Sequence, residues 1–419
     1  GAAGDGAVAV GRWGGGPVGG AEWAVGAPGL EREAPVERVV ELGRQLQGRS
    51  DAAADVIIRR FLAQQIFPIV QEDSATFFFY DGEPADEVRL LHWVFGLESS
   101  LPFQRVGSTK AWFLRLELPR SGRIEYKLLV RRGGRDHLLR DPHNPRRAMD
   151  PFGSNSVCPM PGYQEPTWAE REPGVRRGRM ERFVLPSAVW GDERPVDVYL
   201  PGEFSPQKTY PLLIVHDGDD YRQFANFRGV LDNLIHRHEV RPLVVAFISG
   251  RNRNWEYAAN PQQVAWVVDE VLPALVERYP ISADPDERGL CGASFGGVTS
   301  LYTAWSRPGV FRRLLLQSGS FVFTDIGSHG RPPLWDPIVQ FVNTLRTDPA
   351  RIDARIYMSC GTFESLIFYN RSLAPLLRSA GREVRFVEAQ DGHNWIAWRD
   401  RLREGLTYLF PGYLWMTYE

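Results

Sequence analysis

The sequence predicts an α/β domain with a mostly parallel sheet and helices on both faces, preceded by a β-sandwich domain. From about Gly178 onward, nearly apolar runs alternate with helical stretches, a pattern typical of a parallel sheet covered on both sides. Between Ala75 and about Val157, short β-type runs are separated by turn residues, which favours an antiparallel sandwich. The 419 residues are enough for two or three domains.

The composition excludes several classes of function. Hydrophobic residues make up 43% of the chain and charged residues 24%, as in ordinary globular proteins. The formal net charge is -2, so no whole-molecule field attracts nucleic acid or an anionic membrane, and we expect neither as a partner. No apolar run approaches the roughly 18 residues of a membrane span, and the first residues lack the order of a signal peptide.

The cysteines indicate the compartment. Cys158, Cys291 and Cys360 are too few for a disulfide framework, and two of them lie in apolar stretches. This usage favours a reducing compartment, so we expect a cytoplasmic protein. The sequence does not indicate an oligomeric state.

The N-terminal residues divide into a tail and two helices. Residues 1–30 are rich in Gly and Ala without a steady apolar period, so we expect a tail. Residues 31–74 contain two helical patterns, at about 34–47 and 51–66, and Asp51 is a candidate N-cap for the second. Because apolar residues recur three and four positions apart, we expect both helices to be amphipathic and docked.

Residues 75–177 form the predicted sandwich. From Trp112 to Leu118 every second residue is apolar, so one face of this strand is expected to point into the core and the other outward. The later segment 141–156 is polar, contains Pro and Gly, and has no apolar period. We expect it to be a connector.

Residues 178–419 form the predicted α/β domain, with helices expected at 262–279 and 296–305 among others. Eight apolar runs are the expected strands: 180–187, 195–201, 210–218, 243–249, 287–294, 312–320, 354–361 and 384–392.

The sharpest chemical signal is the run GASFGG at residues 292–297, between the apolar end of a strand and a helical stretch. This context fits a nucleophile elbow, in which Ser294 occupies a sharp turn and Gly292 and Gly296 allow strand and helix to cross closely. The alternative is a chance match in a chain with 41 glycines, but the strand-turn-helix context favours the elbow.

A serine hydroxyl needs a base and a group that orients the base. His393 follows the last predicted strand just before a helix, where an imidazole can reach back over the sheet, although a helix-capping histidine would look the same. Glu364 lies on the loop after the preceding strand and is the expected orienting acid. Asp391, close to the histidine along the chain, and Asp353, before its strand, are weaker candidates.

Oxyanion stabilisation needs two N–H donors. We expect one from the backbone of Phe295, directly after the serine, and the other from the early loop at Asp217 and Gly218. The alternative for that loop is a surface turn with Asx hydrogen bonds. No calcium-loop or zinc spacing occurs, so we expect no metal and no cofactor.

These motifs resemble those of the enterochelin esterases, in the esterase D or putative-esterase superfamily of α/β-hydrolases. The resemblance covers about residues 50–415 and rests on HDG at 216–218, the elbow, QSGS at 317–320, and Gly392-His393 before an aromatic-rich helix. The family's N-terminal module is an immunoglobulin-like β-sandwich, to which residues 106–112, Tyr126-Lys127 and 141–145 are similar. The resemblance therefore implies an α/β-hydrolase domain after an immunoglobulin-like domain.

The resemblance also implies a function and a substrate. Enterochelin esterases hydrolyse the lactone esters of a catecholate siderophore, which can carry iron, so the expected partner is a small-molecule ester. It further implies that Arg222, Arg251 and Arg253 meet catecholate oxygens and that Trp255 and Tyr257 offer aromatic surface. Each arginine could instead be only solvated. Two other hypotheses stay open: a feruloyl or other aryl esterase with a carbohydrate-binding-like β-module, and a catalytically silent binding protein.

Overall fold

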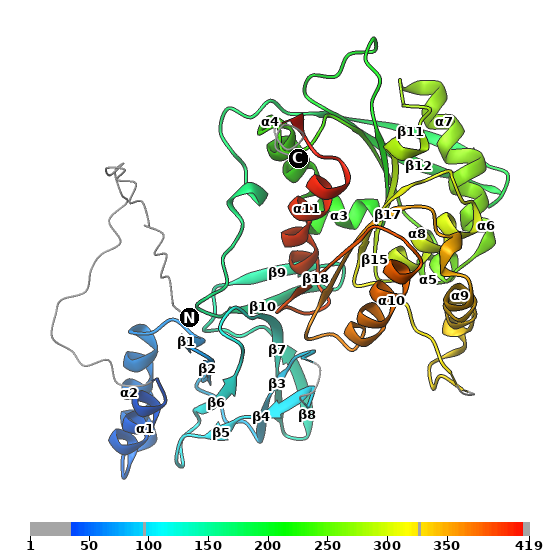
Figure 1. The fold of residues 1–419 in the computed structure, drawn as a ribbon. Coiled ribbons are helices and arrows are strands. Elements are labelled where there is room, and N and C mark those ends of the chain that lie inside the picture. Colours follow the sequence, from blue (N-terminus) through cyan, green and yellow to red (C-terminus); the bar gives the residue numbers. More distant parts are fainter. Residues whose placement is uncertain (1–34, 95–97, 326–327, 414–419) are drawn as a thin grey trace, which may run out of the picture.

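A computed structural model describes residues 35–94, 98–325 and 328–413 (Figure 1). A helical pair, a β-sandwich and an α/β domain follow one another along the chain and lie in the same order in space. The predicted tail at residues 1–30 lies outside the described residues. The exact domain boundaries stay predictions.

The helical pair covers the outer face of the sandwich. Helices α1 (Pro35–Leu46) and α2 (Asp51–Ala63) bury Leu42 and Ile58 against Phe78, which points away from the sandwich core. The predicted N-cap at Asp51 is wrong. The cap is Ser50, whose hydroxyl accepts a hydrogen bond from Ala53 N at 3.5 Å, and Asp51 is already helical, where its charge favours the helix N-terminus.

The sandwich consists of two antiparallel sheets whose inner faces share one hydrophobic core. Its first sheet has the order β1 (Ile69–Gln71), β2 (Ser74–Phe79), β6 (Trp112–Glu117), β5 (Gln104–Arg105). The second has the order β4 (Ser100–Pro102), β3 (Glu87–Leu91), β7 (Arg123–Arg132), β10 (Gly153–Pro159), β9 (Arg147–Asp150), and β8 (Arg135–Leu139) also pairs with β7.

The connector predicted at 141–156 is wrong, because the segment contains β9 and the start of β10. Buried hydrogen bonds fold this polar stretch into the sheet. Tyr126 Oη donates to Asp141 at 2.6 Å, and Asn144 Nδ2 donates to Val157 O at 2.8 Å. Polar side chains with buried partners thus replace the apolar period that would have marked strands.

The α/β domain contains an eight-stranded sheet, and its strands coincide with the eight predicted runs. In spatial order they are β11 (Arg179–Ser187), β12 (Asp192–Leu200), β14 (Val244–Ile248), β13 (Leu212–His216), β15 (Arg288–Ala293), β16 (Arg313–Gln317), β17 (Arg355–Gly361) and β18 (Val384–Ala389). β12 pairs antiparallel with β11 and β14, and the remaining pairs are parallel, so the sheet is mostly parallel as predicted.

Helices cover both faces of this sheet (Figure 1). They are α3 (Gly218–Phe224), α4 (Phe227–His236), α5 (Arg253–Tyr257), α6 (Pro261–Ala265), α7 (Leu272–Arg278), α8 (Phe295–Ser306), α9 (Asp336–Thr347), α10 (Ile367–Ser379) and α11 (Trp395–Leu409). The single helix predicted at 262–279 is α6 and α7 joined by a π-helical turn, Trp266–Val271. No helix within the described ranges is long and apolar enough to cross a membrane.

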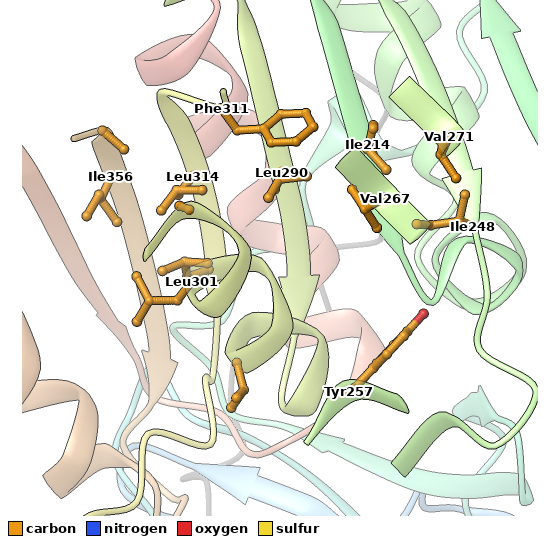
Figure 2. Packing of buried hydrophobic residues seen from close by; sticks show 14 of the residues in the cluster. Ile214, Ile248, Tyr257, Val267, Val271, Leu290, Leu301, Phe311, Leu314 and Ile356 are labelled. Atoms are coloured by element: carbon orange, nitrogen blue, oxygen red, sulfur yellow. The ribbon is translucent and has the colours of Figure 1, made fainter. Parts of the chain in front are cut away.

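The core lies on both faces of the central strands, because their alternate residues are all apolar. Figure 2 shows one face, where Leu290, Leu314 and Ile356 of successive strands pack with Leu301 of α8. On the other face, Leu315 and its neighbours pack against α4 and α11. This rigid sheet fixes the carboxyl ends of the strands, where the candidate site lies.

Candidate active site

Ser294 lies at the turn between β15 and α8. Its backbone has φ 56° and ψ -120°, a conformation that costs energy for a residue with a side chain. A Cβ on Gly292 would lie 2.2 Å from Gly296 O, so only glycine allows β15 and α8 to pass this closely. The serine is therefore held on a sharp strand-to-helix turn, the local geometry that presents a nucleophile.

The Ser294 hydroxyl lies 3.2 Å from Ser320 Oγ. Ser320 is buried, and its N–H donates to Ser294 O at 3.2 Å, so the two serines are bonded by both main chain and side chain. Within the described part of the chain, the Ser294 hydroxyl has no hydrogen bond to His393.

His393 and Glu364 are in direct contact. The loops after β18 and β17 carry them, and because these strands are parallel neighbours their carboxyl ends meet at one edge. His393 Nδ1 lies 2.7 Å from Glu364 Oε2. The other oxygen of this buried carboxylate accepts hydrogen bonds from Ser318 Oγ at 2.7 Å and Gly361 N at 2.9 Å. One carboxylate oxygen is thus held by fixed donors and the other faces the imidazole.

Ser318 and Trp398 complete this arrangement, and the sequence reasoning assigned neither a role. Trp398 Nε1 donates to Ser318 Oγ at 2.9 Å, and its ring meets the His393 ring edge to face with centroids 5.0 Å apart. Ser318 also has a positive φ of 47°, unusual for a residue other than glycine. Its place in QSGS, directly after a strand, was a signal that could have been followed.

The weaker acid candidates lie elsewhere. Asp391 is buried against Arg123 of the sandwich, at 3.2 Å. Asp353 pairs with Arg312 at 2.8 Å. It comes before β17 and so lies at the amino end of that strand, whereas Glu364 follows the carboxyl end. Of these carboxylates, Glu364 is the one that contacts the imidazole.

The two predicted oxyanion segments approach each other. A Cβ on Gly296 would lie 3.3 Å from Asp217 Oδ2, so the loop before α3 adjoins the start of α8. Phe295 and Gly218 are the first residues of α8 and α3, where N–H groups lack intrahelical acceptors. The Asp217 N–H, by contrast, donates to Tyr257 Oη at 3.3 Å.

The predicted arginines are paired with acids at this end of the sheet. Arg253 forms two hydrogen bonds to Asp217, at 2.6 and 2.7 Å, and so stiffens the loop before α3. Arg222 binds Asp197 at 2.8 Å and Asp219 at 2.6 Å. Arg251 keeps 60% of its side chain exposed, which leaves it the freest of the three to meet a ligand.

The predicted aromatic residues differ from each other. Trp255 is half exposed and packs edge to face on Trp190, so it presents surface. Tyr257 is fully buried, and burial raises the pKa of its hydroxyl far above its usual range. The expectation that Tyr257 offers aromatic surface is therefore wrong, because its ring fills the core and its hydroxyl binds Asp217 N.

His216 is the last residue of β13 and is completely buried. Its Nδ1 lies 3.0 Å from Ser300 Oγ. Burial lowers the pKa of His216 to about 4, so its ring is neutral at physiological pH.

Residues 187–409, more than half of the chain, match the family described as putative esterase. The chain belongs to this family. It is 25% identical over 284 residues to the iron(III) enterobactin esterase of Escherichia coli K12, covering 67% of this chain and 65% of that one. It is 27% identical over 241 residues to the iron(III) enterobactin esterase of Dickeya dadantii, covering 53% and 52%. The chain thus spans between half and two thirds of these relatives.

Solved structures show the same fold. The ferric enterobactin esterase of Salmonella typhimurium superposes with a TM-score of 0.71 at 21% identity, covering 84% of this chain and 98% of that one. A Shigella flexneri enterobactin esterase determined in the presence of enterobactin gives 0.67 at 22% identity, covering 81% and 94%. These superpositions cover 84% and 81% of the chain, more than residues 187–409, so the shared fold extends beyond the part that matches the family.

Proposed function

We propose that the chain is a serine carboxylic-ester hydrolase that uses Ser294, His393 and Glu364 as a catalytic triad. The observation that carries this proposal is the 2.7 Å contact between the His393 imidazole and the buried Glu364 carboxylate, at the sheet edge where the elbow presents the serine. Membership of the putative esterase family supports ester hydrolysis as the chemistry.

In the proposed reaction Ser294 Oγ turns from Ser320 toward the imidazole. His393 Nε2 accepts the hydroxyl proton as Oγ bonds to the ester carbonyl carbon. Because Nδ1 faces Glu364, its proton stays there and Nε2 is left free as the base. The imidazolium then gives its proton to the alkoxide oxygen as the ester C–O bond breaks. Water then gives a proton to the same imidazole as its oxygen bonds to the acyl carbon, and the imidazolium returns that proton to Ser294 Oγ as the acyl–Oγ bond breaks.

The developing oxyanion would be held by the N–H groups of Phe295 and Gly218. Each begins a helix whose positive end faces the site, so both the donors and the helix dipoles favour negative charge there. We assign the second donor to Gly218 rather than Asp217, because the Asp217 N–H is already bonded to Tyr257.

We further propose that the substrate is an ester of a catecholate siderophore, with or without bound iron. The enterobactin esterases among the relatives support this class, and the exposed Arg251 and Trp255 suit an anionic aromatic ligand. An immunoglobulin-like assignment of the sandwich and a cytoplasmic location belong to this proposal. The three cysteines are free and buried, which agrees with a reducing compartment.

A smaller aryl ester is the second candidate. A xylanase/feruloyl esterase of Xylanibacter ruminicola is 22% identical over 278 residues, covering 62% of this chain and 35% of that one. Turnover of a tricatechol trilactone and of methyl ferulate, compared as kcat/KM, separates the two substrates.

The chemistry itself is tested by labelling with a fluorophosphonate, which modifies an activated serine. We expect Ser294 to be modified in the wild-type chain and no modification in Ser294→Ala, with the site located by peptide mass analysis. A wild-type chain that is folded but not modified at Ser294 would contradict the proposed function and favour a silent binding protein.

A further inference from the structure

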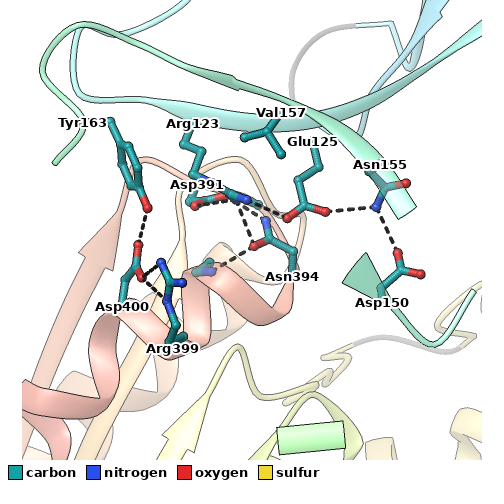
Figure 3. A network of polar contacts seen from close by, with 12 residues as sticks. Arg123, Glu125, Asp150, Asn155, Val157, Tyr163, Asp391, Asn394, Arg399 and Asp400 are labelled. Carbon is teal, nitrogen blue, oxygen red and sulfur yellow. Dashed lines mark hydrogen bonds and ion pairs between the residues drawn. The ribbon is translucent and has the colours of Figure 1, made fainter. Parts of the chain in front are cut away.

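A buried arginine of the sandwich lies against the loop that carries His393. Figure 3 shows Arg123, the first residue of β7, pointing from the sandwich toward Asp391 and Asn394 of the α/β domain. Its Nη1 lies 3.2 Å from Asp391 Oδ2 and 3.2 Å from Asn394 Oδ1, and its Nη2 donates to Glu125 at 2.9 Å. One guanidinium therefore binds a residue before His393 in the chain, Asp391, and the residue after it, Asn394.

The main chain strengthens the same contact. The Arg123 N–H donates to Gln390 O at 3.0 Å, in the way that a neighbouring strand would. Asp391 Oδ1 in turn accepts from Gly392 N and from Asn394 Nδ2, both at 2.7 Å. Asn394 Oδ1 caps α11 by accepting from Ala397 N at 2.9 Å. Residues 390–394 are thus a single hydrogen-bonded unit anchored on the sandwich.

The loop of the acid is anchored on the sandwich as well. Phe363, directly before Glu364, is buried in the hydrophobic core of the sandwich. The Phe363 N–H donates to Asp391 O at 3.2 Å, and a Cβ on Gly361 would lie 2.3 Å from the same oxygen. The two loops therefore pack on each other, and a shift of one displaces the other.

The charges at this contact are almost fully withdrawn from water. Only 3% of the Arg123 side chain, 6% of Asp391 and 7% of Glu125 is exposed. Burial opposes the charge of Arg123, but Asp391 and Glu125 raise its pKa, and burial raises the pKa of Asp391 to about 6. A buried ion pair adds little stability compared with apolar residues of the same size, so a positional role explains it better.

We propose that Arg123 is a positioning residue of the esterase site. Through Asp391 and Asn394 it sets the orientation of His393, and the sandwich is thereby part of the hydrolytic machinery. This proposal rests on the proposed function, because it assigns an orientation to the catalytic base.

The test compares Arg123→Gln and Asp391→Asn with a control, Arg89→Lys, in the full chain. Arg89 is a sandwich arginine whose partners among the described residues, Glu87 and Ser100, both lie in the sandwich. With p-nitrophenyl butyrate, a small ester, we expect kcat to fall about 10- to 100-fold in the first two variants. KM should change little, because both side chains are buried and so are not exposed to a ligand. The control should lower the melting temperature without lowering kcat.

The pH profile separates positioning from a merely structural role. In Arg123→Gln, loss of the counter-charge lets burial raise the pKa of Asp391 further, so this carboxyl is neutral across the acidic limb of the kcat/KM profile and the limb should stay in place. Asp391→Asn instead leaves the positive charge of Arg123 near His393 without this carboxylate, so the limb should move to lower pH. Arg123→Lys keeps the charge but not the fork that reaches three acceptors, so it should leave the limb in place and restore only part of kcat.

Unchanged kcat in Arg123→Gln and an unmoved acidic limb in Asp391→Asn, with only the melting temperatures lowered, would overturn the positioning proposal and leave the proposed function intact. Where Arg123→Gln does not fold, Asp391→Asn decides by the same two measurements. Failure of the wild-type chain to react with a fluorophosphonate at Ser294 would instead overturn the proposed function.

Discussion

Glu364→Gln tests the triad most sharply, because the structure fixes which way the new amide must face. Glu364 Oε1 accepts from Gly361 N and Ser318 Oγ. The backbone N–H cannot become an acceptor, and the Ser318 proton is directed at the carboxylate because its oxygen already accepts from Trp398. The oxygen of the new amide must therefore occupy the Oε1 position, which turns the NH2 group toward His393 Nδ1.

The consequence is the wrong imidazole tautomer. With Nδ1 forced to accept, the ring proton moves to Nε2, which can then no longer take the proton of Ser294. The equivalent carboxylate-to-amide change in other serine hydrolases lowers kcat about 10⁴-fold, or about 5.5 kcal/mol of barrier. We expect the same order here, and a smaller loss for Glu364→Ala, which leaves the tautomer free.

The assay is steady-state hydrolysis of p-nitrophenyl butyrate at pH 8 by both variants, with melting temperatures measured in parallel. A Glu364→Gln chain that stays within about tenfold of wild type, or that exceeds Glu364→Ala in activity, would refute the argument. If Glu364 were refuted in this way, another carboxylate would have to orient His393, and Asp391 would be the first to examine.

Three further outcomes are expected. Ser294→Ala should abolish hydrolysis and change the melting temperature little, since it removes only the hydroxyl with its contact to Ser320 and keeps the backbone turn; wild-type turnover in this variant would place the nucleophile elsewhere. Trp398→Phe keeps the ring beside His393 but loses the bond to Ser318, so kcat should fall about tenfold, as for one hydrogen bond. Because burial lowers the pKa of His216 to about 4 from an ordinary value of about 6.5, the unfolded chain binds the extra proton. The free energy of unfolding should then keep its full contribution from neutral His216 above about pH 6.5, and lose about 3 kcal/mol of it as the pH falls toward 4. The urea concentration at half-unfolding should differ less between pH 7 and pH 5 in His216→Asn than in a control variant at an exposed histidine, His137→Asn.

Much of the fold was predictable because its signals are local. All eight strands of the central sheet overlap runs that are rich in apolar residues, and the elbow needs only the spacing of two glycines around Ser294. The pairing of His393 with Glu364 also follows from order, because loops after adjacent parallel strands meet at one edge. Strand β9 was missed because its stretch is polar, and the buried bonds that fold this stretch join Asp141 to Tyr126 and Asn144 to Val157, 15 and 13 positions away.

The rest of the site depends on contacts that no local pattern encodes. Trp398 and Ser318 are 80 positions apart, and each looks like an ordinary helix or loop residue until their hydrogen bond is seen. Arg123 and Asp391 are 268 positions apart and belong to different domains. In a chain rich in arginine, nothing in the sequence distinguishes Arg123 from the solvated ones.

The sandwich contact has a simple origin in the sheet topology. β18 is the last strand of the eight-stranded sheet, so the loop after it has a neighbouring loop on one side only. Glu364 and Phe363 come from that one side, and the other side would face water. The sandwich takes the place of the missing strand: Arg123 N binds Gln390 O as a strand partner would, and its side chain holds Asp391. The edge loop that carries the proposed catalytic imidazole thereby acquires the rigidity of an interior loop.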